Sequence, residues 1–546
     1  MSANSDNWDR DEDFAWRRPA PLARGAAMVI YSWKEPGWSF LWSVLAAAPF
    51  ILAAVLAPAL LSLSPTVDMI APIAEARAIS AGAEALSDNA SPFYVMLLLA
   101  ADIFAEAPGR IHLIAKALSA LFVVYPMAYF ASSRLPIIPA ALTTGALGAY
   151  VASPFAGPSE FALAIFLATS FCFIAASADN APGRARFEGL IAGVGLFALW
   201  QLNPVFSLAG FIALSACPFL SGRCGLSRYA ATLAVFAVLA GLAEWLAPGI
   251  NIARASAASG VLQVSAPFSG GEGAMGLSGV AVSTVLVLLS ASVFGGREHL
   301  RSWLTALLLG ITAFIAARLT GANALPVFVL VAAIAVFSVS SPFYDGLFRS
   351  HDRASVSVAL TGGALTLFWT VAIVVHSAGQ FALQYQVAEA APENIRTELA
   401  LVQPGGPTIA QWIEEGRFST VEAREFFALA PVDQSMMLLE AAGRAKSMAA
   451  EGWGVAILTG ADTACVLAER RQCEATGDAA ASLANVVFVP RLDLDPATTA
   501  AIGRAEALLY TEFKLVEQTP VWEIWVRRGA TVPASLLKTS GSVLYR

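Results

Sequence analysis

Long apolar runs separated by short polar turns dominate the first 378 residues of the chain. The first run, Trp38–Leu63, is long enough to cross a membrane, since a spanning helix needs about 20 apolar residues. Pro92–Phe104 is also apolar, but it is too short to cross comfortably and is predicted to be a re-entrant or surface segment. Further apolar segments follow at 111–132, 135–153, 159–177, 187–202, 204–220, 229–247, 276–294, 302–318, 324–341 and 355–378.

The stretch Ser64–Asp88 interrupts this apolar pattern with charge. It carries Asp68, Glu75, Arg77, Glu84 and Asp88, while Val67, Ile70, Ala71 and Ala74 recur at helical spacing. The pattern predicts a helix that lies along the membrane surface and turns its carboxylates toward an aqueous pocket. A solvated loop, whose charges only confer solubility, is an equal alternative.

Residues 379–546 have ordinary charge density and a different periodicity. A helix is predicted at Gln434–Ala449, and buried strands are predicted at Gly454–Leu458 and Val486–Val489. Two more strands are predicted on either side of Thr519-Pro520. These residues are therefore expected to form a small α/β domain.

The amino-acid composition agrees with the pattern of long apolar runs. The chain has 546 residues, of which 57% are hydrophobic and 13% are charged, whereas a soluble protein has about 25% charged residues. We therefore expect a polytopic α-helical membrane protein. The net charge of -7 argues against a nucleic-acid partner, which would need a basic face. Five cysteines are too few for a disulfide scaffold, although Cys465 and Cys473 could pair if the tail is extracytoplasmic.

The distribution of basic residues predicts the orientation, because cytoplasmic loops are enriched in Lys and Arg. If Pro92–Phe104 does not cross, the cytoplasmic loops contain Arg134, Arg184, Arg186, Arg223, Arg228, Arg297, Arg301, Arg349 and Arg353. This predicts about eleven spanning helices, with the N-terminus inside and the C-terminus outside. The domains are a cytoplasmic tail at 1–37, a transmembrane domain at 38–378 with an outer loop at 64–91, and a periplasmic α/β domain at 379–546.

Several short motifs in the first third of the chain occur together in one known superfamily. They are Asp68 to Ala78, Ser80-Ala81-Gly82, Ser91-Pro92-Phe93-Tyr94, Ala107-Pro108-Gly109-Arg110, Ser132-Ser133-Arg134 and Ser159-Glu160. In this order they resemble the front half of the GT-C glycosyltransferases, which include the aminoarabinose transferases and protein O-mannosyltransferases. The chain departs from that pattern in having Asp68-Met69 in place of an acidic pair.

The resemblance implies an inverting enzyme of the bacterial inner membrane. It would move a sugar from a polyprenyl-phosphate-linked donor to a lipid, glycan or protein acceptor at the outer face. Asp68 matches the first acid of the family and Glu160 the second, and a carboxylate can serve either as a base or as a ligand for a divalent metal ion. The residues expected to bind substrate or lipid phosphate are Arg77, Arg110, Arg254, Arg318 and Tyr94, because guanidinium groups stabilise a phosphate leaving group.

Other interpretations of the same residues stay open. Each arginine can be an interfacial anchor, and Glu160 can simply favour the start of a helix. His112 could join the site or simply sit in its helix, and the second interpretation is favoured. The Gly- and Ser-rich loop 248–275 is a flexible connector or a flap. A non-catalytic scaffold subunit of a membrane complex is the alternative function, and a transporter ranks last because internal repeats are not evident.

Overall fold

The structure is a computed structural model, and its chain forms two compact units that alternate along the sequence. One unit, the larger, comprises Met1–Leu52 and Ser119–Ala378, and the second comprises Ala53–Leu118 and Gly379–Arg546. The segment after the first apolar run therefore belongs with the C-terminal residues. The structure describes residues 36–60, 67–80, 91–105, 108–135, 137–153, 156–172, 182–221, 226–252, 254–255, 297–320, 322–329, 363–379, 431–459, 477–491, 496–519, 521–533 and 536.

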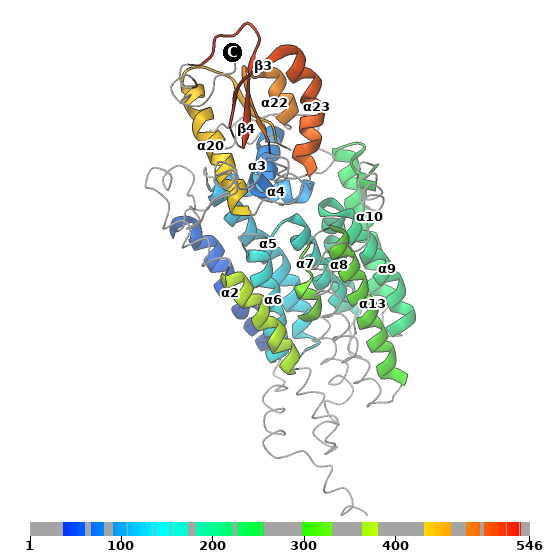
Figure 1. Ribbon diagram of the computed structural model, residues 1–546. Helices are drawn as coiled ribbons and strands as arrows, with labels where there is room; N and C mark the ends of the chain where they lie inside the picture. Colours follow the sequence, from blue (N-terminus) through cyan, green and yellow to red (C-terminus); the bar gives the residue numbers. More distant parts are fainter. Residues whose placement is uncertain are drawn as a thin grey trace, which may run out of the picture. The chain divides into compact units, whose positions relative to one another are not determined.

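Helices form where the apolar runs predict them (Figure 1). Several begin with a proline, which suits the first helical position because the N–H that it lacks would have no partner there. The helices of the larger unit include α6 (Ile137–Ala152), α7 (Pro158–Phe171), α8 (Pro182–Leu202), α9 (Pro204–Ser221), α10 (Leu226–Leu246), α13 (Arg297–Thr320) and Gly363–Gly379. Two further helices, α2 (Pro36–Leu60) and α5 (Pro108–Ser132), run through the boundary between the units.

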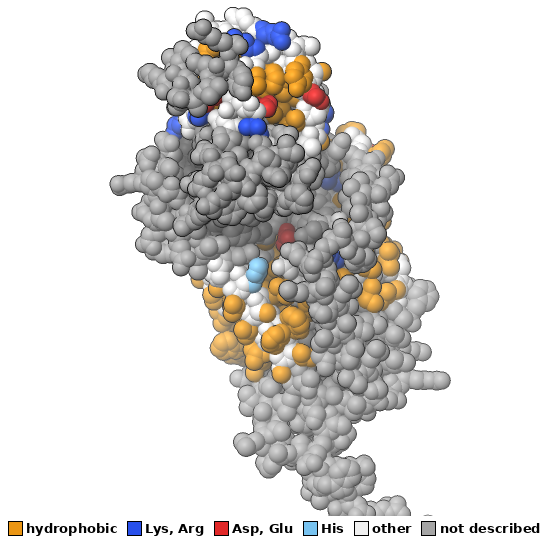
Figure 2. Space-filling view, in the orientation of Figure 1, with side chains coloured by type: hydrophobic (Ala, Val, Ile, Leu, Met, Phe, Trp, Pro, Cys, Tyr) orange, Lys and Arg blue, Asp and Glu red, His pale blue; other side chains and the backbone are white. Residues whose placement is uncertain are grey.

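The outer surface of these helices is apolar. Trp38 is 54% exposed on α2 and Val238 is 69% exposed on α10, and Figure 2 shows hydrophobic side chains gathered over the described helices. Among the described residues, three helices are long and apolar enough to cross a membrane, at Trp38–Leu56, Gly109–Ser132 and Ser227–Leu246. Exposed apolar surface of this kind suits contact with lipid, and the long apolar helices agree with the predicted membrane character. The number of crossings and the orientation stay predictions.

Glycines let α8 and α10 pack closely in the larger unit. A Cβ atom on Gly189 would lie 2.5 Å from the Arg228 carbonyl oxygen, and one on Gly193 would lie 2.7 Å from the Thr232 carbonyl oxygen. Small residues four apart on one helix face bring two backbones together, which is the main source of helix packing in lipid. This contact fixes the position of α10 beside α8.

The predicted surface helix is present in the second unit as α3 (Val67–Ser80). It packs against α4 (Pro92–Asp102), the helix formed by the short apolar segment. At 11 residues, α4 is about 16 Å long, whereas the hydrocarbon core is about 30 Å thick. The length of α4 therefore agrees with a segment that does not cross.

The C-terminal residues form the predicted α/β domain. A four-stranded sheet has the order β1-β2-β4-β3, in which β1 and β2 are parallel and the other two pairs are antiparallel. Figure 1 shows α22 and α23 on one side of the sheet and α20 on the other. The elements are α20 (Pro431–Ala450), β1 (Val455–Ile457), α22 (Gly477–Leu483), β2 (Val486–Pro490), α23 (Pro496–Glu512), β3 (Phe513–Gln518) and β4 (Trp522–Arg527).

The core of this domain lies between the sheet and its helices. Phe513 and Trp525 pack with α22 and α23 on one face. On α20, Arg444 donates to the Glu517 carboxylate on β3 at 2.8 Å. Helix α20 also contacts α3 within the same unit. The charged helix that follows the first apolar run is therefore part of the packing of the C-terminal domain.

Some predictions fall on residues outside the described ranges. These are the N-terminal tail up to residue 35, most of the loop 248–275, the apolar segment 276–294, most of 324–341, and the pair Cys465 and Cys473.

Candidate functional site

The seven predicted site residues are divided between the two units. Asp68, Arg77, Tyr94 and Arg110 belong to the second unit, while Glu160, Arg254 and Arg318 belong to the larger one. Asp68 is the second residue of α3, and Arg77 lies in the last turn of the same helix. A cation in the last turn is favoured by the helix dipole.

Arg77 is buried and forms an ion pair. Its Nη2 atom lies 3.1 Å from Oδ1 of Asp102, the last residue of α4. The Arg77 side chain is 6% exposed and that of Asp102 is 34% exposed, so this pair is only partly screened by solvent. The pair joins α3 to one end of α4.

A second buried cation lies at the other end of α4. Lys116 on α5 is fully buried, and its ammonium nitrogen lies 5.2 Å from the centre of the Tyr94 ring. This distance is within the range of a cation–π interaction. Tyr94 is itself buried. Since Asp102 is eight positions after Tyr94, the two contacts lie about 12 Å apart along α4.

Helix α4 therefore connects two buried cations on two different helices. Ionisable groups buried among apolar helices are costly, and in membrane proteins they mark the paths of substrates and ions. An ammonium and a guanidinium are the groups that bind phosphate. The sequence pattern identified Arg77 as a candidate site residue, but it did not identify Lys116 or Asp102. The signal for Lys116 was available, because it is a charge within an otherwise apolar run.

The other predicted arginines differ in exposure. Arg110 is exposed in the first turn of α5, and Arg318 is exposed in the last turn of α13. Arg254 is buried. The exposed pair can meet a ligand or lipid headgroups without rearrangement, whereas Arg254, like Arg77 and Lys116, is enclosed by the protein.

The Glu160 side chain accepts two backbone hydrogen bonds at the start of α7. Its Oε2 atom accepts a hydrogen bond from the N–H of Gly157, the N-cap residue of α7, at 2.7 Å. Its Oε1 atom accepts from the Asn323 N–H at 3.4 Å, while the Asn323 carbonyl accepts from the Tyr150 hydroxyl at 2.7 Å. The carboxylate thus ties the segment after α13 to α6 and α7, in agreement with its alternative interpretation as a residue that starts a helix.

A buried ion triad that the sequence pattern did not reveal lies in the larger unit. Glu188 on α8 pairs with Arg134 at 2.8 Å and with Arg228 at 2.6 Å. Arg134 also donates to the Cys172 carbonyl at 3.0 Å. All three charged side chains are at most 3% exposed. The two arginines, predicted to lie in cytoplasmic loops, therefore also link the ends of α5, α7, α8 and α10.

His112 is buried within α5. The described part of the chain contains no group of three or more His, Cys, Asp or Glu side chains that could hold a metal ion.

No family model and no curated protein matches the chain. Solved structures similar to it include ArnT from Cupriavidus metallidurans in the apo state, with a TM-score of 0.41 and 12% identity over 90% of this chain and 97% of that chain. The same enzyme bound to undecaprenyl phosphate has a TM-score of 0.36 and 13% identity, over 91% and 99% of the two chains. The archaeal oligosaccharyltransferase AglB from Archaeoglobus fulgidus, in complex with an inhibitory peptide and a dolichol-phosphate, has a TM-score of 0.27 and 12% identity, over 90% and 75%.

Proposed function

We propose that the chain is a GT-C-type membrane glycosyltransferase that moves a sugar from a polyprenyl-phosphate-linked donor to a lipid, glycan or protein acceptor. The observation that carries the proposal is the second unit, in which the charged helix α3 has Asp68 as its second residue and packs on α4. Two buried cations contact α4, namely Arg77 of α3 and Lys116 of α5. A base and phosphate-binding cations are the groups that this reaction needs.

In the proposed reaction, the Asp68 carboxylate takes the proton of the acceptor hydroxyl. The acceptor oxygen forms a bond to the anomeric carbon of the sugar, and the bond between that carbon and the phosphate oxygen breaks. The polyprenyl phosphate leaves with the bonding electrons, and the anomeric configuration inverts because there is one displacement. A divalent metal ion held by Asp68 is the alternative use of this carboxylate.

The leaving phosphate gains negative charge, so cations near it lower the barrier. Arg77 and Lys116 are assigned to this task, with Asp102 orienting the first and the Tyr94 ring placing the second. The exposed Arg110, one turn and a half before Lys116 on α5, is assigned to the approach of the lipid phosphate. The phosphate-binding roles of Arg254 and Arg318 rest on the resemblance of the sequence to the GT-C glycosyltransferases.

The reaction is proposed to take place at the outer face of the inner membrane, with the N-terminus in the cytoplasm and the C-terminal domain in the periplasm. The distribution of basic residues supports this orientation. The contact between α3 and α20 supports a common side for the loop 64–91 and the C-terminal domain, because elements that touch outside the bilayer share a compartment.

A non-catalytic scaffold subunit is the second candidate function. The observation that favours it is Glu160, whose two oxygens both accept backbone hydrogen bonds. A carboxylate used in this way supports the fold with or without chemistry.

Two substitutions test the proposal. Asp68→Asn is expected to abolish transfer of labelled sugar from the polyprenyl-phosphate donor while polyprenyl phosphate still binds, since the amide cannot act as a base. Lys116→Met is expected to weaken the binding of polyprenyl phosphate. Glu512→Gln, at an exposed carboxylate of α23, is the matched control. Unchanged transfer in Asp68→Asn removes this residue from the mechanism, and a wild-type chain that binds polyprenyl phosphate but transfers no sugar favours the scaffold.

A further inference from the structure

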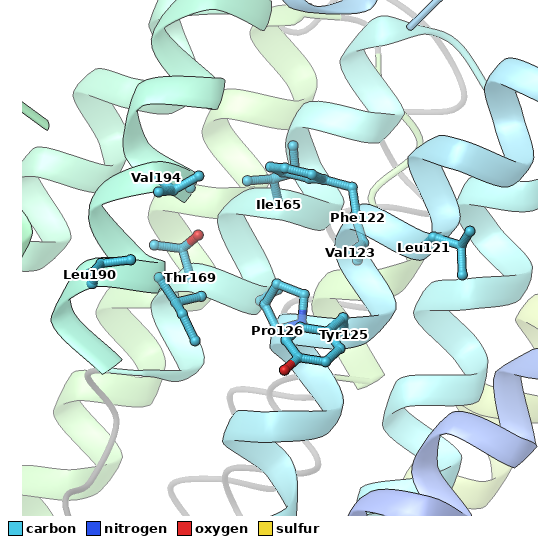
Figure 3. Close-up of a pocket in the computed structure, with 12 residues that line it drawn as sticks. Leu121, Phe122, Val123, Tyr125, Pro126, Ile165, Thr169, Leu190 and Val194 are labelled. Atoms are coloured by element: carbon cyan, nitrogen blue, oxygen red, sulfur yellow. The ribbon is translucent and has the colours of Figure 1, made fainter. Parts of the chain in front are cut away.

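An apolar crevice opens between α5, α7 and α8 in the larger unit (Figure 3). Its volume is about 300 Å³. In Figure 3, Leu190 and Val194 of α8 lie on one side, Phe122 and Pro126 of α5 lie on the other, and Thr169 of α7 lies between them. Apart from the Thr169 hydroxyl, the side chains that line it are apolar or aromatic.

The mouth of the crevice faces outward from the helices. Three of its lining side chains are largely exposed, namely Leu121 at 51%, Tyr125 at 56% and Leu190 at 45%. These residues lie on helices that are predicted to cross the membrane, and α5 is long and apolar enough to do so. Their exposed apolar surface therefore faces hydrocarbon and not water.

The crevice lies past the midpoints of α5 and α7, toward the C-terminal ends of those two helices, and near the middle of α8. On α5 it begins at Leu121, 13 residues after Pro108, and is thus about 20 Å from the helix start. The ion triad of Arg134, Glu188 and Arg228 marks the same end of the helices. This is the end predicted to face the cytoplasm. None of the residues that line the crevice is a candidate site residue.

An exposed cation lies beside the mouth. Arg186 is four residues before Leu190 on α8, so the two side chains share one helix face. Arg186 is exposed and forms no ion pair with any described residue. Next to it, the Phe187 ring packs edge to face on Tyr129 of α5, with ring centres 5.6 Å apart. A basic and aromatic border of this kind suits the headgroup layer.

We propose that this crevice binds one diacyl phospholipid with an anionic headgroup, with the headgroup phosphate at Arg186 and part of an acyl chain inside. A methylene group occupies about the volume of a water molecule, ~30 Å³, so the space accepts roughly ten methylene groups. Basic pockets between helices on the cytoplasmic side are typical sites for anionic lipid. The proposal does not depend on sugar transfer.

The test is native mass spectrometry of the purified full-length chain, titrated with phosphatidylglycerol, with phosphatidylcholine of the same acyl chains, and with a polyprenyl phosphate. We expect one tightly held phosphatidylglycerol and weaker binding of phosphatidylcholine. Val194→Phe displaces about two methylene groups and is expected to weaken binding about tenfold. Ile212→Phe, on the exposed face of α9, is the matched control and is expected to leave binding unchanged.

Arg186 provides a second and independent arm, because an exposed side chain is replaced without loss of folding. Arg186→Gln is expected to weaken phosphatidylglycerol binding about fivefold, whereas Arg186→Lys retains it. Equal binding of the two phospholipids, or no effect of Arg186→Gln, would overturn the proposal. Displacement of phosphatidylglycerol by an equal concentration of polyprenyl phosphate would also overturn it, because the crevice would then hold the isoprenoid carrier. If Val194→Phe does not fold, the Arg186 variants decide the result.

Discussion

Replacing Glu188 with glutamine should destabilise the larger unit severely. The carboxylate lies 2.8 Å from one Arg134 nitrogen and 2.6 Å from one Arg228 nitrogen, and its side chain is 1% exposed. In Glu188→Gln both guanidinium groups stay buried while the carboxylate charge that they share is gone. Removing one partner of a buried ion pair costs about 3–5 kcal/mol, and here two arginines share the lost partner.

The measurement is the free energy of unfolding by sodium dodecyl sulfate in mixed micelles. Glu512→Gln is the control, because its ion pair with Arg527 is long, at 3.6 Å, and both side chains are at least 33% exposed. An exposed pair of this kind contributes at most about 1 kcal/mol. Replacing Arg134, Glu188 and Arg228 together by apolar residues should restore much of the stability, since no buried charge then remains. A loss in Glu188→Gln no larger than in the control would refute this reasoning.

Three further predictions concern other parts of the fold. Glu160→Gln should keep both stability and sugar transfer, because a glutamine side chain can also accept the Gly157 N–H, whereas Glu160→Ala should lose about 1 kcal/mol. Loss of transfer in a stable Glu160→Gln protein would instead identify a catalytic acid. Gly193→Val should disrupt the α8–α10 contact and lower thermal stability, while the same change at Gly241, which has open space around it, should have little effect. In a double-mutant cycle of unfolding free energies, Arg77→Ala and Asp102→Ala should show a coupling of about 1 kcal/mol or more, and additive losses would contradict the ion pair.

The local elements follow from the sequence because each depends on nearby residues. The period of apolar positions predicted α3 and α20, and prolines mark the starts of α5, α7, α8 and α9. The strands around Thr519-Pro520 follow from short apolar runs next to a turn signal. Their neighbours in the sheet, with β4 between β2 and β3, were not predicted, since strand order depends on contacts between distant segments.

The candidate site was only partly predictable. The charge pattern pointed to Asp68 and Arg77, and the start of α7 explained Glu160 by an ordinary helix cap. Asp102 and Lys116 were missed because each was read as part of an apolar segment, and their partners are 25 and 22 residues away along the chain.

The membrane class, the helices and the α/β tail could be read from composition and periodicity, because these properties belong to single segments. Which charged residues pair with one another is decided only when the chain folds. Arg134 and Arg228 resemble any basic loop residues until Glu188, 54 residues beyond the first, is brought between them. The same holds for the packing of α3 on α20 and for the crevice between α5, α7 and α8. Such contacts join segments far apart in the chain, and nothing local in the amino-acid sequence specifies which of them will meet.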